Sequence, residues 1–175
     1  HTGGSGTTIS TLTFTGTTNT YKSDSTYTVT VDVTNANYTA GTNKFGFSLV
    51  ALNSSNNSVG TITAGSGSNT SIAGGRTYLG HVSASTTKSW TFTWKAPSTA
   101  YTGAITFYLC GNAGNGNGGS SGDQTSTYSI TLTNANPTVQ DINVRQGGAS
   151  YLNSSTFNYG TVTNNTNLDK AFAIQ

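Results

Sequence analysis

Hydrophobic and polar residues alternate with a period of two along most of the first 133 residues. In the clearest run, Tyr27, Val29, Val31 and Val33 share one face, and hydroxyl or carboxylate side chains share the other. Successive side chains of a β-strand point to opposite faces, so this pattern predicts a half-buried strand. The pattern recurs in four shorter runs, each bounded by Gly, Asn, Ser or Pro: Leu12–Phe14, Trp90–Trp94, Ile105–Leu109 and Tyr128–Leu132.

The number and spacing of these runs indicate the fold class. Further candidate strands lie at Phe45–Leu52, Val59–Thr63 and Thr77–Val82, and no segment has the 3.6-residue period of an amphipathic helix. About eight short strands separated by turn residues are typical of two antiparallel sheets packed face to face. We therefore expect an all-β chain whose main part is an antiparallel β-sandwich.

The pattern changes at Asn134-Ala-Asn-Pro137, where Pro137 follows a completed strand. Eight apolar positions follow it: Ile142, Val144, Tyr151, Phe157, Tyr159, Val162, Phe172 and Ile174. Only about 38 residues remain, which is too few for a sandwich of about 100 residues. We expect a complete sandwich at residues 1–133, a linker at 134–141 and a partial second β module at 142–175.

An incomplete module would leave strand edges exposed. Exposed edges pair readily with strands of other chains. The hypothesis that follows is assembly into a filament or array by β-strand addition. The partners would be copies of this chain or other surface proteins.

Composition and charge narrow the class of protein. The chain is 33% hydrophobic and only 7% charged, its five acidic residues are all Asp, and it has no Met, unlike helical bundles. Its seven basic residues are scattered and the formal net charge is +2, so we expect no nucleic-acid partner. No segment approaches the roughly 20 apolar residues of a membrane-spanning helix, so we expect no membrane span.

Cys110 is the single cysteine of the sequence, which excludes an internal disulfide. The preceding residues, Ile105–Leu109, are mostly apolar. This flank predicts a buried and unreactive thiol.

The two histidines, His1 and His81, are the candidate metal ligands. The sequence begins at His1 rather than Met, so we expect a processed mature form or a trimmed fragment. If His1 is a true terminus, its amine and ring could join His81 in a copper site of the histidine-brace type, since imidazole is the commonest metal ligand. The alternative is a frayed terminus at His1, with His81 ending a strand near Tyr78 and its ring hydrogen-bonded.

No catalytic residues are predicted. The five Asp residues are dispersed and offer no pair for acid–base work, and the Gly-x-Ser-x-Gly motif does not occur. Residues 111–122 are rich in Gly and Asn, and are expected to form a loop that is either functional or a flexible cover. Asp123 follows this loop and is expected to shape a turn rather than bind calcium. Trp90, Phe92 and Trp94 are expected in the core rather than in a platform for sugars.

The order of several motifs resembles the Reeler domain, especially its bacterial relatives among the choice-of-anchor modules of secreted proteins. The motifs that carry the resemblance are Tyr27–Val31, Phe45–Ala51, Tyr78–His81, Trp90–Pro97, Gly103–Tyr108 and the glycine-rich loop followed by Asp123. The resemblance covers residues 7–133. It implies an immunoglobulin-like β-sandwich, secretion, and a place at the cell surface or in extracellular matrix. It does not imply an enzyme.

The same resemblance bears on the tail and on cofactors. Phe157–Val162 is similar to the opening of another immunoglobulin-like anchor module, which makes 142–175 a partial immunoglobulin-like β segment. Bacterial relatives often carry a Cys-x-x-Cys-His haem attachment just before the domain. In a trimmed chain, His1 would then be the proximal haem ligand and His81 the distal one. The attachment cysteines are missing from the sequence, so no cofactor is the first expectation, with haem c or copper as the alternatives.

The function expected from the sequence is that of a secreted structural or adhesive module that is not an enzyme. Its affinity would come from main-chain pairing and multivalency rather than from a deep pocket. The rival hypothesis is an extracellular electron-transfer protein that uses His1 and His81.

Overall fold

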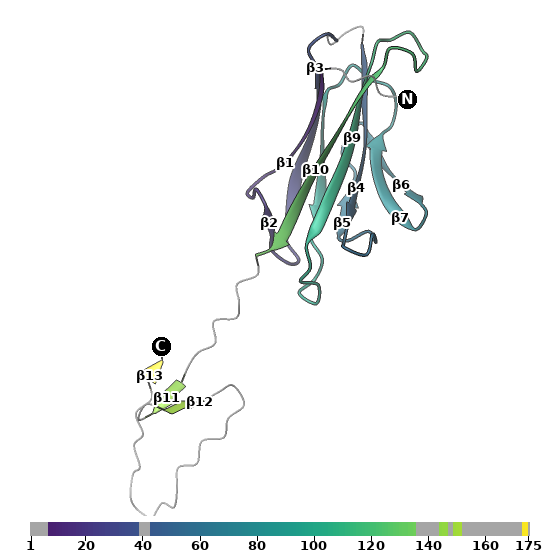
Figure 1. Cartoon of the computed structure of the whole chain (residues 1–175). Helices are drawn as coiled ribbons and strands as arrows, with labels where there is room; N and C mark the ends of the chain where they lie inside the picture. The colour runs from purple at the N-terminus through teal and green to yellow at the C-terminus, as the bar shows by residue number, and fades with distance from the viewer. Residues whose placement is uncertain (1–6, 39–42, 136–143, 147–148, 152–172, 175) are drawn as a thin grey trace, which may run out of the picture. The chain divides into compact units, whose positions relative to one another are not determined.

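The chain divides into two units, His1–Asn136 and Pro137–Gln175, and the described residues of the first unit form ten strands in two sheets (Figure 1). The computed structural model describes residues 7–38, 43–135, 144–146, 149–151 and 173–174. None of the described residues is helical, and hence none lies in a helix suited to crossing a membrane. The all-β fold class expected from the sequence is confirmed.

The two sheets of the first unit are almost entirely antiparallel. The smaller sheet has four strands, in the order β1 (Thr8–Phe14), β3 (Thr26–Asn35), β8 (Ser89–Lys95) and β5 (Thr61–Thr63). The larger sheet has six, in the order β2 (Thr20–Tyr21), β10 (Gln124–Asn134), β9 (Ile105–Gly114), β4 (Lys44–Leu52), β7 (Arg76–His81) and β6 (Ser68–Ala73). Among the strand pairs of the described residues, only the short pair of β2 with β10 is parallel.

The core lies between the two sheets and is built from the inward residues of each alternating strand. Trp94 is fully buried, and its ring meets Phe107 edge-on with the centroids 5.0 Å apart. Its indole Nε1 donates a hydrogen bond to the carbonyl oxygen of Val59 at 3.2 Å, so the polar edge of the ring is also satisfied. Trp90 and Phe92 are buried beside it. The expectation that this aromatic row belongs to the core is confirmed.

Strands β9 and β10 extend farther than the sequence predicted. Residues 111–114 continue β9, so the expectation that residues 111–122 form only a loop is wrong. Gly111 faces inward, where an added Cβ would lie 2.1 Å from Ser10 Oγ. The glycine is therefore there to let β1 approach the larger sheet closely, rather than to make a loop flexible.

Tyr21 anchors the two-residue strand β2 in the core. Its side chain is fully buried, and its hydroxyl donates to the carbonyl oxygen of Gly103 at 2.7 Å. Burial, with a smaller contribution from Tyr101, raises the pKa of Tyr21 above its ordinary value of 10.0. Because the folded state favours the protonated hydroxyl, its contribution to stability is present below pH 10.0 and is lost as the pH rises through the higher folded value.

The second unit contains three short strands among its described residues. Strand β11 (Val144–Gln146) lies between β12 (Ala149–Tyr151) and β13 (Ala173–Ile174), and both pairs are antiparallel. In the first unit, β10 ends at Asn134. Most of the predicted linker at 134–141 and of the partial β segment at 142–175 lies outside the described residues.

Replacing a core aromatic should cost far more stability than replacing its neighbour on the outer face. We expect Phe107→Ala to lower the free energy of unfolding by about 3–5 kcal/mol, because Phe107 is fully buried among aromatic rings. The matched control is Tyr108→Ala, at a side chain that is 47% exposed, with an expected cost below about 1 kcal/mol. Chemical denaturation followed by tryptophan fluorescence measures both, and similar costs for the two variants would contradict the assigned faces of β9.

Candidate functional site

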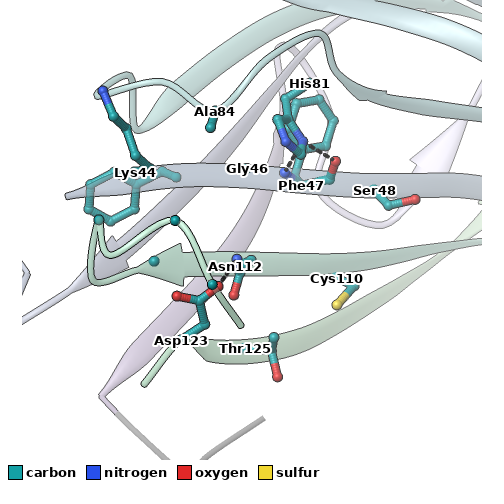
Figure 2. A pocket seen from close by; sticks show the side chains of 15 residues that line it. Lys44, Gly46, Phe47, Ser48, His81, Ala84, Cys110, Asn112, Asp123 and Thr125 are labelled. Atoms are coloured by element: carbon teal, nitrogen blue, oxygen red, sulfur yellow. Dashed lines mark hydrogen bonds between the residues drawn. The ribbon is translucent and has the colours of Figure 1, made fainter. Parts of the chain in front are cut away.

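A cavity lies on the outer face of the six-stranded sheet, where the β9–β10 loop meets β4 (Figure 2). Its volume is about 670 Å³. Side chains or backbone from four strands and the loop line it, among them Lys44, Ser48, His81, Cys110 and Asp123. Neighbouring strands of one sheet therefore supply its floor, and the glycine-rich loop supplies one wall.

A second cavity of about 320 Å³ adjoins the first and shares Ser48 and Cys110 with it. Tyr78 and Tyr108 line this second part. The two cavities together are called the outer-face groove below. It combines aromatic rings at one end with imidazole, amide and carboxylate groups at the other.

His81 is the last residue of β7, and its exposed ring lies across β4. Nδ1 of His81 lies 3.1 Å from both the backbone nitrogen and the carbonyl oxygen of Phe47 (Figure 2). It accepts from the N–H when the ring hydrogen is on Nε2, and it donates to the carbonyl oxygen when the hydrogen is on Nδ1. His81 thus ends a strand with its ring hydrogen-bonded, as the non-ligand alternative expected.

Gly46 makes this position of the ring possible. A Cβ at residue 46 would lie 2.4 Å from Cε1 of His81, far inside van der Waals contact. The sequence signal for this contact was a glycine between Phe45 and Phe47, since glycine inside a strand often marks a close approach. The sequence interpretation noted the motif but did not assign the glycine a role.

The two predicted metal ligands are not brought together by anything described. His1 lies outside the described residues. Among the described residues, no three His, Cys, Asp or Glu side chains group as they would around a metal ion. Nδ1 of His81 faces the Phe47 backbone, which leaves Nε2 as the ring atom for an added ligand. Binding of haem or copper at His1 and His81 stays a prediction.

The β9–β10 loop is organised by its own polar side chains. Asp123 is 7% exposed and accepts hydrogen bonds from Asn115 N and Asn112 Nδ2, each at 3.3 Å. Asn115 Oδ1 then accepts from Asn117 N at 3.0 Å, and Asn117 Oδ1 accepts from Gly119 N at 2.9 Å. Successive asparagines therefore hold successive turns of the loop, and Asp123 shapes its base, in agreement with the turn-forming role expected of it.

Cys110 is exposed, so the prediction of a buried thiol is wrong. In β9, Phe107 and Leu109 point into the core, and alternation places Cys110 on the opposite face, in the outer-face groove. The prediction treated all the residues before Cys110 as one apolar segment, although they alternate between the two faces of the strand. The period-two pattern of the same segment already placed Cys110 out of phase with Leu109.

Comparisons with known proteins give the following similarities. A family model described as the Reeler domain matches residues 1–111. The Reeler domain of human F-spondin is 17% identical, over 71% of this chain and 80% of that one, with a TM-score of 0.45. Another structure, the Reelin-N domain of F-spondin, is 17% identical over 73% and 87%, with a TM-score of 0.49. A DUF4466 family protein from Parabacteroides merdae is 12% identical over 71% and 43%, with a TM-score of 0.43. No curated protein matches the chain.

The contact between Gly46 and His81 can be tested by a double-mutant cycle. We expect Gly46→Ala alone to lower stability by about 1–3 kcal/mol, because the new methyl group displaces the ring and leaves Phe47 N–H without its acceptor. In a His81→Ala background the same change should cost much less, since the clash is gone. Thermal denaturation of the four proteins measures the coupling, with Gly119→Ala as a control at a loop glycine where an added Cβ would make only ordinary van der Waals contacts. Equal costs in both backgrounds would show that the ring does not cover Gly46.

The exposed thiol should react in the folded protein. We expect one equivalent of a thiol reagent such as dithionitrobenzoate to react per chain without denaturant, at a rate close to that of a free thiol. Cys110→Ser should abolish the signal, because the sequence has one cysteine. Reaction only after denaturation would restore the buried assignment.

Proposed function

The chain belongs to the Reeler domain family, and from this premise we propose that it is a secreted module, structural or adhesive, of a cell surface or extracellular matrix. The family match also confirms the resemblance that the sequence motifs indicated. Reeler domains are non-enzymatic modules found in extracellular matrix proteins. The match to residues 1–111 is the observation that carries the proposal.

The surface of the sandwich supports a role in adhesion. Its outer faces are covered by hydroxyl groups, as in the cross-strand pair of Thr106 and Thr131, whose Oγ1 atoms are 2.9 Å apart. The outer-face groove adds the exposed ring of Tyr108, a type of side chain that is enriched in binding surfaces. Such a surface binds through many polar contacts, each weak, and many copies on one surface multiply their effect.

The sheet edges support assembly by strand addition. Strand β1 is an edge strand of the four-stranded sheet, and β6 is an edge strand of the six-stranded sheet. Neither strand contains a charged residue or a proline. Each exposes a large hydrophobic side chain, Ile9 at 59% and Ile72 at 80%. Natural edge strands are usually protected by charge, proline or a covering segment. These two strands are therefore the proposed points at which copies of the chain or other surface proteins join.

The electron-transfer hypothesis remains a second candidate, supported by the geometry of His81. With its hydrogen on Nδ1, the ring donates to the carbonyl oxygen of Phe47 and presents Nε2 as the ligating atom, the arrangement found for metal-binding histidines that are oriented by their second nitrogen; the ring also lines a cavity. The sequence has no Cys-x-x-Cys pair, so its residues do not fit a covalently attached haem. An absorption spectrum and metal analysis of purified chain test this candidate, with His81→Ala as the control. Stoichiometric copper or a Soret band that depends on His81 would favour it over the structural module.

Localisation tests the main proposal. An antibody against the chain should detect it in the medium or on the surface of intact producing cells, where added protease removes it. A cytoplasmic protein should serve as the control and survive the same treatment. Detection only inside protease-resistant cells would contradict the proposal.

Adhesion by many weak contacts predicts a steep dependence on density. Beads coated with the full chain should bind the surface of the producing cells, and binding should rise faster than in proportion to coating density. Beads coated with the heat-unfolded chain at the same density are the control. A response in simple proportion to density, or equal binding by the unfolded chain, would contradict adhesion by the folded module.

A further inference from the structure

Strand β6 is an open edge at the margin of the six-stranded sheet (Figure 1). Within the part of the chain that the structure describes, β6 pairs only with β7, through a register that joins Ser68 to His81 and Ala73 to Arg76. A two-glycine turn, Gly74 and Gly75 with φ of 56° and 74°, connects the two strands. These left-handed positions favour a tight hairpin, so β6 is held straight beside β7 and its other side is open.

Hydrogen bonds identify which backbone groups of β6 face the open side. The N–H of Thr70 donates to Oδ1 of Asn69 at 2.8 Å, and the N–H of Ser68 donates to the carbonyl oxygen of Gly65 at 3.2 Å. The N–H of Val82 donates to the carbonyl oxygen of Gly67 at 3.0 Å, so residue 67 and its opposite residue 82 form a hydrogen-bonded pair one step from the pair of Ser68 and His81. In an antiparallel pair of strands, the backbone N–H and C=O of a residue either both bond to the residue opposite or both point away from the partner strand. The two arrangements alternate along the strand. Thr70 and Ile72 therefore present their N–H and C=O groups to the open side.

The exposure of Ile72 shows that this edge is not protected. Ile72 is opposite Thr77 and Thr70 is opposite the buried Leu79, so these side chains share the core-facing side of the hairpin. Ile72 is nevertheless 80% exposed, since no described residue covers the hairpin at that position. A hydrophobic side chain beside unpaired backbone groups, in a strand without charge or proline, is the pattern that natural edges usually avoid.

We propose that β6 pairs antiparallel with β6 of a second copy of this chain, around a two-fold axis at Ser71. This register places Thr70 of each copy opposite Ile72 of the other, so that the backbone groups facing the open side form two hydrogen-bonded pairs. Ile72 of each copy then covers the methyl group of Thr70 in the other. In a two-fold dimer, the same surface patch of each copy contacts the other. Because β6 carries no charge, two β6 strands do not repel each other.

Asn69 controls access to this edge. Its side chain occupies the N–H of Thr70 and must release it before pairing, so it competes with the second copy. The interface is small, and pairs of free chains should be weak. The inference rests on the proposed function, because it identifies the partner in surface assembly as a second copy of the chain. In a dense surface layer, many weak pairs act together and strengthen the assembly.

A cysteine placed on the two-fold axis tests the register directly. Ser71 would face its own copy in a pair without hydrogen bonds, where Cα atoms are about 4.5 Å apart, within the range of a disulfide. We expect the full chain with Ser71→Cys and Cys110→Ser to form a covalent dimer under mild oxidation at high concentration. Ala73→Cys with Cys110→Ser is the matched control, because residue 73 is also exposed on β6 but would lie opposite residue 69. Little dimer in the first protein, or equal dimer in both, overturns the proposal.

Further changes in the Ser71→Cys protein separate pairing from chance collision. Ile72→Lys should slow dimer formation at least about tenfold, while Val82→Lys, at a side chain that is 65% exposed outside β6, should not. Asn69→Ala should speed it, since the competing acceptor is removed. Circular dichroism verifies that each variant is folded. Equal rates for the two lysine variants, or slowing by Asn69→Ala, overturn the proposal. These results are independent of localisation. If the chain is extracellular but does not pair, only this inference is contradicted. If it pairs but is found inside cells, only the proposed function is contradicted.

Discussion

Packing of aromatic rings between the two sheets is the interaction on which the rest of this structure depends. Trp94 of the smaller sheet meets Phe107 of the larger one at 5.0 Å, and Phe14 closes on Phe107 at 4.9 Å. Aromatic pairs in edge-to-face contact contribute energy beyond their buried area. Because this core satisfies the inner faces, the outer faces need no apolar cover and carry hydroxyl groups instead. The groove, the loop and the open edges are all features of those outer surfaces.

Small residues decide how closely the remaining parts approach this core. Gly111 lets β1 approach the larger sheet, and Gly46 lets the imidazole of His81 lie across β4. Both contacts depend on the lack of a side chain, and both position polar groups where a larger residue would exclude them. On the outer face, the groove therefore owes its shape to Gly46 inside β4 as well as to the glycine-rich loop beside it.

Strands in which apolar and polar residues alternate clearly could be predicted from the sequence. Strands in which this alternation is weak could not. Strands such as β3 and β8 bury one full face, so their apolar residues recur at every second position and the pattern is clear. Strand β6 has a single large apolar residue, Ile72, and was not predicted; the Gly74-Gly75 turn was its only local signal. For the site, His81 was identified, but its contact with Phe47 joins residues 34 apart in the sequence, and no local pattern contains it. Cys110 was misassigned although the alternation of its own strand was visible.

The scarcity of charge has a consequence for the conditions in which this surface works. With 7% charged residues and a formal net charge of +2, little of the surface responds to screening by dissolved ions. Contacts made by hydroxyl groups, backbone amides and apolar side chains depend only weakly on ionic strength. Binding by these outer faces would therefore change little between low and high ionic strength.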